Sequence, residues 1–138
     1  MCLKYACNIN VEKDIVCYKV YLKFYNNILL SPYRRSLAPE FNVVAKTNLG
    51  QVQEYWNTLS EGFHSYVDLY DAIDEALYWN MCNPIIVKCI IPKGSKCYIG
   101  RFSDKASYCS DSIKLVEQIE IILPELNLNK TYSKIKNT

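Results

Sequence analysis

Hydrophobic and polar positions alternate most regularly near the start of the chain, in VCYKVYLKF at residues 16–24. One face of this segment carries an apolar side chain at every second position, and the other face is mostly polar and includes Lys19. A period of two with β-branched and aromatic residues is typical of a half-buried strand. The Asn26-Asn27 pair favours a turn. Residues 28–30 are therefore predicted to return as the second strand of a hairpin.

Apolar positions change to a helical period after the only histidine, His64, in EGFHSYVDLYDA at residues 61–72. From residue 69 to residue 77 they recur three and four positions apart and form one stripe. Ser65 is placed to cap a helix, and Asp68 completes a motif similar to a capping box. The pattern predicts a helix over about residues 66–80, ending before the Asn83-Pro84 pair. His64 then lies at the helix entry, and Gly62 supplies an unusual backbone conformation.

The second half of the chain returns to strand patterns. Residues 85–91, IIVKCII, are almost continuously apolar, which predicts a central strand covered on both faces. A Pro-Lys-Gly-Ser turn then leads into an alternating segment at residues 96–102. Residues 103–107 are predicted to be a loop, residues 108–110 a brief strand and residues 113–123 a longer one. In the first half, residues 31–41 read as a loop, residues 41–46 as a strand, and residues 51–59 as a short helix or a strand.

Strands and helix are thus segregated along the chain rather than alternating. This order predicts an α+β fold, with a mixed or mainly antiparallel sheet packed against one principal helix at about residues 66–80. The length of 138 residues suits one hydrophobic core. We expect one compact domain over residues 1–126, followed by a polar, lysine-containing tail over residues 127–138.

Composition excludes several classes of function. Sixteen basic and fourteen acidic residues leave a formal charge of +2, too little to attract nucleic acid or an anionic membrane strongly. No apolar run reaches the ~20 residues of a membrane-spanning helix. Seven cysteines without a Cys-x-x-Cys pair, together with one histidine, make a metal site unexpected. An amino terminus without secretory features and free thiols predict a cytoplasmic protein, in the host cytoplasm if a phage encodes it.

Two segments are the main candidates for binding chemistry. The first is SPYRRS at residues 31–36, because adjacent arginines beside a tyrosine can bind a phosphate or carboxylate, although a solvated surface pair is the alternative. The second is His64, either a structural residue at the helix entry or a pocket residue. Polar aromatic segments at residues 101–105 and 108–111 add two further positions. The candidate ligand-binding residues are therefore Tyr33, Arg34, Arg35, His64, Arg101 and Tyr108.

Five motifs together resemble a family of small proteins encoded by gut Bacteroidetes bacteria and by their phages and prophages. They are SPY (31–33), GFHSY (62–66), DAIDEA (71–76), IIVKCIIPKGSKCYIG (85–100) and YCSDSI (108–113). The resemblance covers about residues 15–120 and implies no catalytic residue. It implies a context in which small proteins bind a host defence protein or a nucleotide signal.

A second resemblance is looser. A Gly-aromatic-His segment that enters a helix, beside strands with Arg and Tyr, is similar to small ADP-ribosyltransferase-like proteins. That likeness implies an NAD pocket with His64, Arg34 and an acidic residue on a late strand. Glu117 and Glu120 are the candidates for the acidic residue.

Three hypotheses about function follow. The first is a non-enzymatic phage or mobile-element binding protein without a cofactor. It would act in counter-defence by binding a host protein or by sequestering a small anionic or nucleotide ligand. The second is the ADP-ribosyltransferase-like enzyme. The third is a homo-oligomeric structural or virion-associated protein, for which the twelve tyrosines suit an interface.

Overall fold

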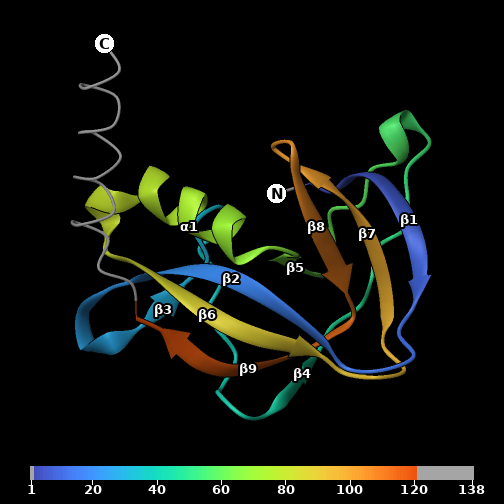
Figure 1. Ribbon diagram of the computed structural model, residues 1–138. Helices are drawn as coiled ribbons and strands as arrows, with labels where there is room; N and C mark the ends of the chain where they lie inside the picture. The colour runs from blue at the N-terminus through green and yellow to red at the C-terminus, as the bar shows by residue number, and fades with distance from the viewer. Residues whose placement is uncertain (1, 121–138) are drawn as a thin grey trace.

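The computed structural model describes residues 2–120, in which nine strands form one sheet beside a single α-helix (Figure 1). The helix is α1 (Leu69–Tyr78), and short 3-10 turns are η1 (Tyr25–Asn27), η2 (Tyr55–Asn57) and η3 (Asn80–Cys82). The strands are β1 (Lys4–Asn10), β2 (Ile15–Lys23), β3 (Leu29–Leu30), β4 (Val44–Lys46), β5 (Phe63–Tyr66), β6 (Pro84–Ile91), β7 (Lys96–Phe102), β8 (Lys105–Ser110) and β9 (Ser112–Ile119).

The sheet order is β1-β7-β8-β5-β2-β6-β9-β4, with β3 on β2, and every pairing between these strands is antiparallel. The α+β prediction is therefore roughly consistent with the fold, although the sheet dominates over the helix. No helix in residues 2–120 is long and apolar enough to cross a membrane. The tail predicted over residues 127–138 lies outside the described residues.

The apolar run at residues 85–91 forms β6, which lies between β2 and β9 as predicted for a central strand. Its odd-numbered side chains enter the main core, while Ile86 on its other face packs in a second cluster with Ala72 and Ala76 of α1. Val87, Cys89 and Ile91 are fully buried in the main core, together with Leu115 of β9. The hairpin of β2 and β3 is also confirmed, through the pairs Leu22↔Leu30 and Lys23↔Leu29.

The sheet divides into two halves between β2 and β5. Strand β2 pairs with β6 continuously from Ile15↔Ile91 to Leu22↔Pro84, but it pairs with β5 only at Tyr18↔Tyr66. Figure 1 accordingly shows β2, β6 and β9 running together on one side, while β5, β8, β7 and β1 form the other half. Beyond Tyr18 the two strands are not joined by backbone pairs.

Helix α1 begins later than predicted, because residues 63–66 are a strand. They pair with β8, from Phe63↔Ser110 to Tyr66↔Ser107. Asp68 is the N-cap, and its side chain accepts a hydrogen bond from the Tyr70 backbone N–H at 2.9 Å. The prediction of Ser65 as the cap, and of His64 as a helix-entry residue, is therefore wrong. A pairing partner more than 40 positions away outweighed the local capping signal.

Replacing Asp68 by alanine should lower the free energy of unfolding by about 1 kcal/mol, because an N–H at the helix start loses its acceptor. Urea denaturation measures this change. Ser65→Ala is the matched control, since the Ser65 hydroxyl is buried without a hydrogen-bond partner and should cost much less. Equal losses in the two variants would contradict the assignment of the cap.

Other differences from the predicted elements are local. Residues 4–10 form the edge strand β1, which the sequence pattern did not predict. The predicted loop at residues 103–107 is only a tight turn, because β8 already begins at Lys105. Ser103 and Asp104 adopt positive φ angles there, which allows the chain to reverse in two residues. Strand β4 is shorter than predicted, and residues 55–57 form the 3-10 turn η2.

Candidate functional site

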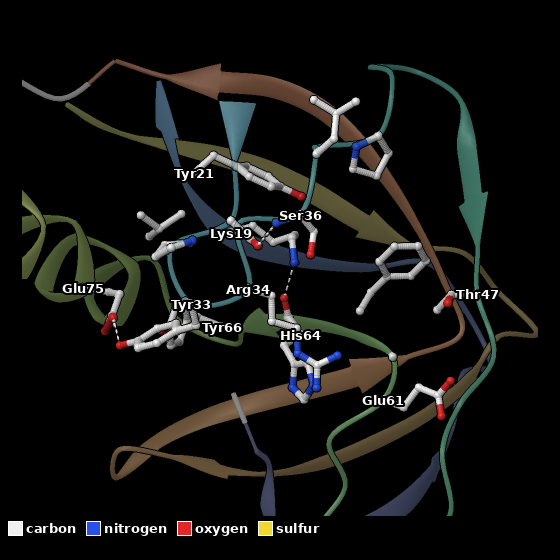
Figure 2. A pocket seen from close by; sticks show the side chains of 17 residues that line it. Lys19, Tyr21, Tyr33, Arg34, Ser36, Thr47, Glu61, His64, Tyr66 and Glu75 are labelled. Atoms are coloured by element: carbon white, nitrogen blue, oxygen red, sulfur yellow. Dashed lines mark hydrogen bonds between the residues drawn. The ribbon is translucent and has the colours of Figure 1, made fainter. Parts of the chain in front are cut away.

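A pocket of about 390 Å³ lies at the division of the sheet (Figure 2). One wall comes from β2, the opposite wall from β5, and the loop at residues 31–39 covers the space between them. Helix α1 contributes Glu75 at one end. The lining residues are Lys19, Val20, Tyr21, Ser31, Pro32, Tyr33, Arg34, Ser36, Leu37, Pro39, Thr47, Glu61, Gly62, Phe63, His64, Tyr66 and Glu75.

Lys19 bridges the two halves of the sheet. Its ammonium group donates a hydrogen bond to the His64 carbonyl oxygen of β5 at 2.6 Å, where β2 and β5 no longer pair (Figure 2). The ion pair found among residues 2–120 joins Lys88 and Glu117, so no described carboxylate lies within 4.0 Å of the Lys19 ammonium. Burial lowers the pKa of Lys19, because desolvation disfavours the charged form. The pocket thus contains a half-buried amine that no carboxylate among residues 2–120 pairs with.

Arg34 and His64 meet at the Ser60 carbonyl oxygen. The Arg34 guanidinium donates to it at 2.9 Å, and His64 Nε2 lies 2.8 Å from the same oxygen. Because a carbonyl only accepts, the proton of His64 is on Nε2, and Nδ1 is left with no hydrogen-bond partner in the described structure. His64 is only 7% exposed, and burial lowers its pKa to about 4. The imidazole is therefore neutral at pH 7, and Arg34 is the second cation of the pocket.

Glu75 occupies the other end of the pocket and is only 5% exposed. Its Oε1 accepts hydrogen bonds from the Tyr33 hydroxyl and, at 3.1 Å, from Trp79 Nε1. The Tyr33 ring also packs edge-on against Trp79, with centroids 5.6 Å apart. Burial and the Glu75 carboxylate raise the pKa of the Tyr33 hydroxyl, which therefore stays a donor. These contacts hold the covering loop against α1.

Two buried cysteines, Cys97 and Cys109, are not activated nucleophiles. Cys109 Sγ lies 3.8 Å from His64 Nε2, but burial raises the pKa of this thiol to about 12. Cys97 is likewise buried, and its pKa is also raised to about 12. Thiols with such pKa values stay protonated at neutral pH. Within residues 2–120, no group of three or more histidine, cysteine and acidic residues is arranged to hold a metal ion.

The structure brings three of the sequence-predicted residues into this pocket, namely Tyr33, Arg34 and His64. The other three lie elsewhere. The Arg35 guanidinium stacks over the Phe24 and Trp79 rings, at 5.6 and 5.9 Å from their centroids. The Arg101 side chain donates to the Asp104 carbonyl in the β7–β8 turn, and Tyr108 packs against the main core.

The two late-strand acids do not line the pocket. Glu117 lies on β9, where its carboxylate is 3.9 Å from the Lys88 ammonium, and Glu120 follows the end of that strand. The carboxylates on the pocket wall are those of Glu61 and Glu75.

The sequence pattern did not single out Lys19 or Glu75. A lysine on the polar face of a strand normally points to solvent, and Glu75 lies outside the apolar stripe of the helix. Only the division of the sheet half-buries Lys19, and only the covering loop buries Glu75. No local signal distinguishes them from ordinary surface charges.

Comparison of the chain with protein-family models, with curated proteins and with solved structures finds no match. The fold and the pocket define a sheet-dominated α+β protein with a partly cationic pocket between two halves of its sheet. Function is therefore inferred from the chemistry of the pocket residues.

Proposed function

We propose that the protein binds a small ligand with an anionic group, in the pocket at the division of the sheet. The observation that supports this function is the Lys19 ammonium, which is desolvated and has no carboxylate partner in the described structure. Among residues 2–120 it makes one hydrogen bond, to the His64 carbonyl. An ammonium group has three donors, so two remain for a ligand.

An anion bound next to Lys19 offsets the free-energy cost of holding its positive charge without a carboxylate partner. Burying a charge without an opposite charge is unfavourable, and an anionic ligand supplies the missing partner. Arg34 lines the same pocket and presents a planar guanidinium, which binds phosphate or carboxylate through two parallel hydrogen bonds. The Ser36 and Thr47 side chains add hydroxyl groups to the wall.

This binding activity fits the hypothesis of a non-enzymatic phage or mobile-element protein that sequesters an anionic or nucleotide ligand in the host cytoplasm. Binding of a host protein and assembly into a homo-oligomer are the competing forms of that hypothesis. Light scattering of the purified protein, with and without ligand, separates a monomeric ligand-binding protein from an oligomer.

Lys19→Met should weaken the binding of anions at least tenfold while the protein stays folded, because methionine fills the same space without the charge. The measurement is thermal unfolding with a panel of inorganic phosphate, nucleoside monophosphates and dicarboxylates. A ligand at 100 times its Kd stabilises the wild-type protein by about 2.7 kcal/mol. The unfolding midpoint of the unliganded variant should remain within about 4 °C of the wild-type value.

Lys88→Met is the matched control. Lys88 also lies on a central strand, but it is paired with Glu117 outside the pocket, so its loss should leave anion binding unchanged. A panel that never shifts the wild-type midpoint would refute the proposed function. Equal binding by the Lys19 variant would refute the role of the ammonium.

One observation supports the ADP-ribosyltransferase-like enzyme as a second candidate. His64, Arg34 and the buried Glu75 carboxylate line the same cavity, and glycosyl transfer needs a carboxylate beside the reacting centre. The carboxylate in this case is Glu75 rather than Glu117 or Glu120. Incubation of the protein with labelled NAD and host lysate tests this candidate. Absence of labelled protein at high enzyme concentration would exclude it.

A further inference from the structure

The pocket has two chemically different ends. Figure 2 shows Glu75 with Tyr33 and Tyr66 at one end, set apart from Lys19, Arg34 and His64. Among residues 2–120, Glu75 and Lys19 do not form an ion pair. The carboxylate and the ammonium therefore do not neutralise one another, and each is available to a different part of a ligand.

The Glu75 end is suited to a hydrogen-bond donor. The carboxylate is 5% exposed, and the partners shown for it, Tyr33 and Trp79, are neutral donors that both bond to Oε1. The Tyr66 hydroxyl is near enough for the Glu75 charge to raise its pKa, although burial contributes more. A carboxylate accepts about four hydrogen bonds, so these two donors leave room for another.

The walls next to Glu75 are suited to a planar group. Tyr33 and Tyr66 line the pocket beside Glu75, and Tyr21 also lines it. Flat rings pack favourably against aromatic side chains, and stacking on such side chains is a common way to hold a nucleobase. The volume of about 390 Å³ is in the lower part of the range for small-molecule pockets and suits a single nucleotide.

His64 supplies an independent observation at the cationic end. It is 7% exposed, and its Nδ1 is a buried acceptor without a donor in the described structure. Its backbone carbonyl is bonded to Lys19, and its ring shares the Ser60 carbonyl with Arg34. These groups suit a ligand with an anionic group and a neighbouring hydroxyl. The anionic group would bind Lys19 and Arg34, and the hydroxyl would donate to His64 Nδ1. A ribose phosphate has that arrangement.

We infer that the ligand is a nucleoside monophosphate whose base carries an amino group, with the phosphate at Lys19 and Arg34 and the base edge at Glu75. This inference rests on the proposed function, since it names the ligand class of the same pocket. An amino N–H donates to the Glu75 carboxylate, whereas a carbonyl oxygen at the same position of the base is repelled by it. The pocket therefore selects amino-bearing bases over their carbonyl counterparts.

Isothermal titration with two matched nucleotide pairs tests the selection. The pairs are GMP with XMP and AMP with IMP, which differ by an amino group against a carbonyl oxygen. In at least one pair the amino nucleotide should bind about tenfold more tightly, the effect of one hydrogen bond to a charged group. Glu75→Gln should remove this preference, because the side-chain amide no longer offers a carboxylate. Glu117→Gln, an exposed change on β9, should retain it.

Ribose 5-phosphate separates this inference from the proposed function. It should bind more weakly than the preferred nucleotide, be insensitive to Glu75→Gln and be lost with Lys19→Met. If ribose 5-phosphate bound as tightly as every nucleotide, the inference about the base would be overturned and the proposed anion site would remain. No binding of any of the five probes would overturn both. If Glu75→Gln failed to fold, the nucleotide pairs measured on the wild-type protein would still decide, and equal affinities within both pairs would refute the inference.

Discussion

Gly62→Ala is expected to lower the free energy of unfolding by roughly 3–5 kcal/mol, the largest loss among the substitutions considered. Gly62 has a φ of +144°, a conformation that residues with a side chain rarely adopt. A methyl group there would also lie 2.6 Å from Cys109 Sγ and 2.6 Å from Leu49 Cδ2. The two costs add, because the backbone of β5 cannot relieve the contact without breaking its pairing with β8.

Urea denaturation of Gly62→Ala beside Gly94→Ala separates the two costs. Gly94 also has a positive φ, of +84°, but an added methyl group there meets nothing within 4 Å. The Gly94 variant should therefore show only the backbone cost of about 1–3 kcal/mol. A Gly62 variant that is no less stable than the Gly94 variant would show that the packing around β5 yields easily.

Acidification from pH 7.5 to pH 4.5 should destabilise the protein by about 2–3 kcal/mol through His64 alone. The folded protein holds the pKa of His64 at about 4, against an ordinary histidine pKa of about 6.5. Below pH 6.5 the unfolded chain takes up a proton that the folded protein does not bind. The contribution of the neutral histidine to stability is thus complete above pH 6.5 and is lost as the pH falls toward 4.

The comparison that isolates this effect is His64→Gln. Glutamine can donate to the Ser60 carbonyl but does not titrate, whereas the acidic residues contribute equally in both proteins. Urea denaturation across the pH range should therefore show a steeper loss of stability for the wild-type protein. Parallel pH profiles would mean that His64 is protonated as easily in the folded protein as in the unfolded chain.

The sequence pattern predicted most of the central elements. Period two identified β2, the continuous apolar run identified β6, and the apolar stripe identified α1. These signals work because the spacing of apolar residues within one element shows whether one face or both faces of that element are buried. The pattern was weaker where the side chains are mixed. The edge strand β1 was missed, and the beginning of β8 was taken for a loop.

For the candidate site, residue chemistry predicted Tyr33, Arg34 and His64, whereas Lys19 and Glu75 could not be found. Arginines in a proline-rich loop and a single histidine are unusual enough to stand out in a sequence. A lysine in an alternating strand and a glutamate on a helix are common on surfaces. What changes their role is burial by segments 12 to 45 positions away, as in the hydrogen bond between Lys19 and the His64 carbonyl.

The sequence by itself determined an α+β fold with a central apolar strand, one amphipathic helix and a near-neutral charge, because each follows from local spacing or from composition. The tertiary structure alone decided where the sheet divides, and thereby where the pocket lies. It also decided that residues 63–66 are a strand, so that His64 lies buried beside Lys19 and not at the start of the helix. The physical reason is that pairing between distant strands stabilises the backbone more than a local cap does, and this pairing is not encoded in any one segment.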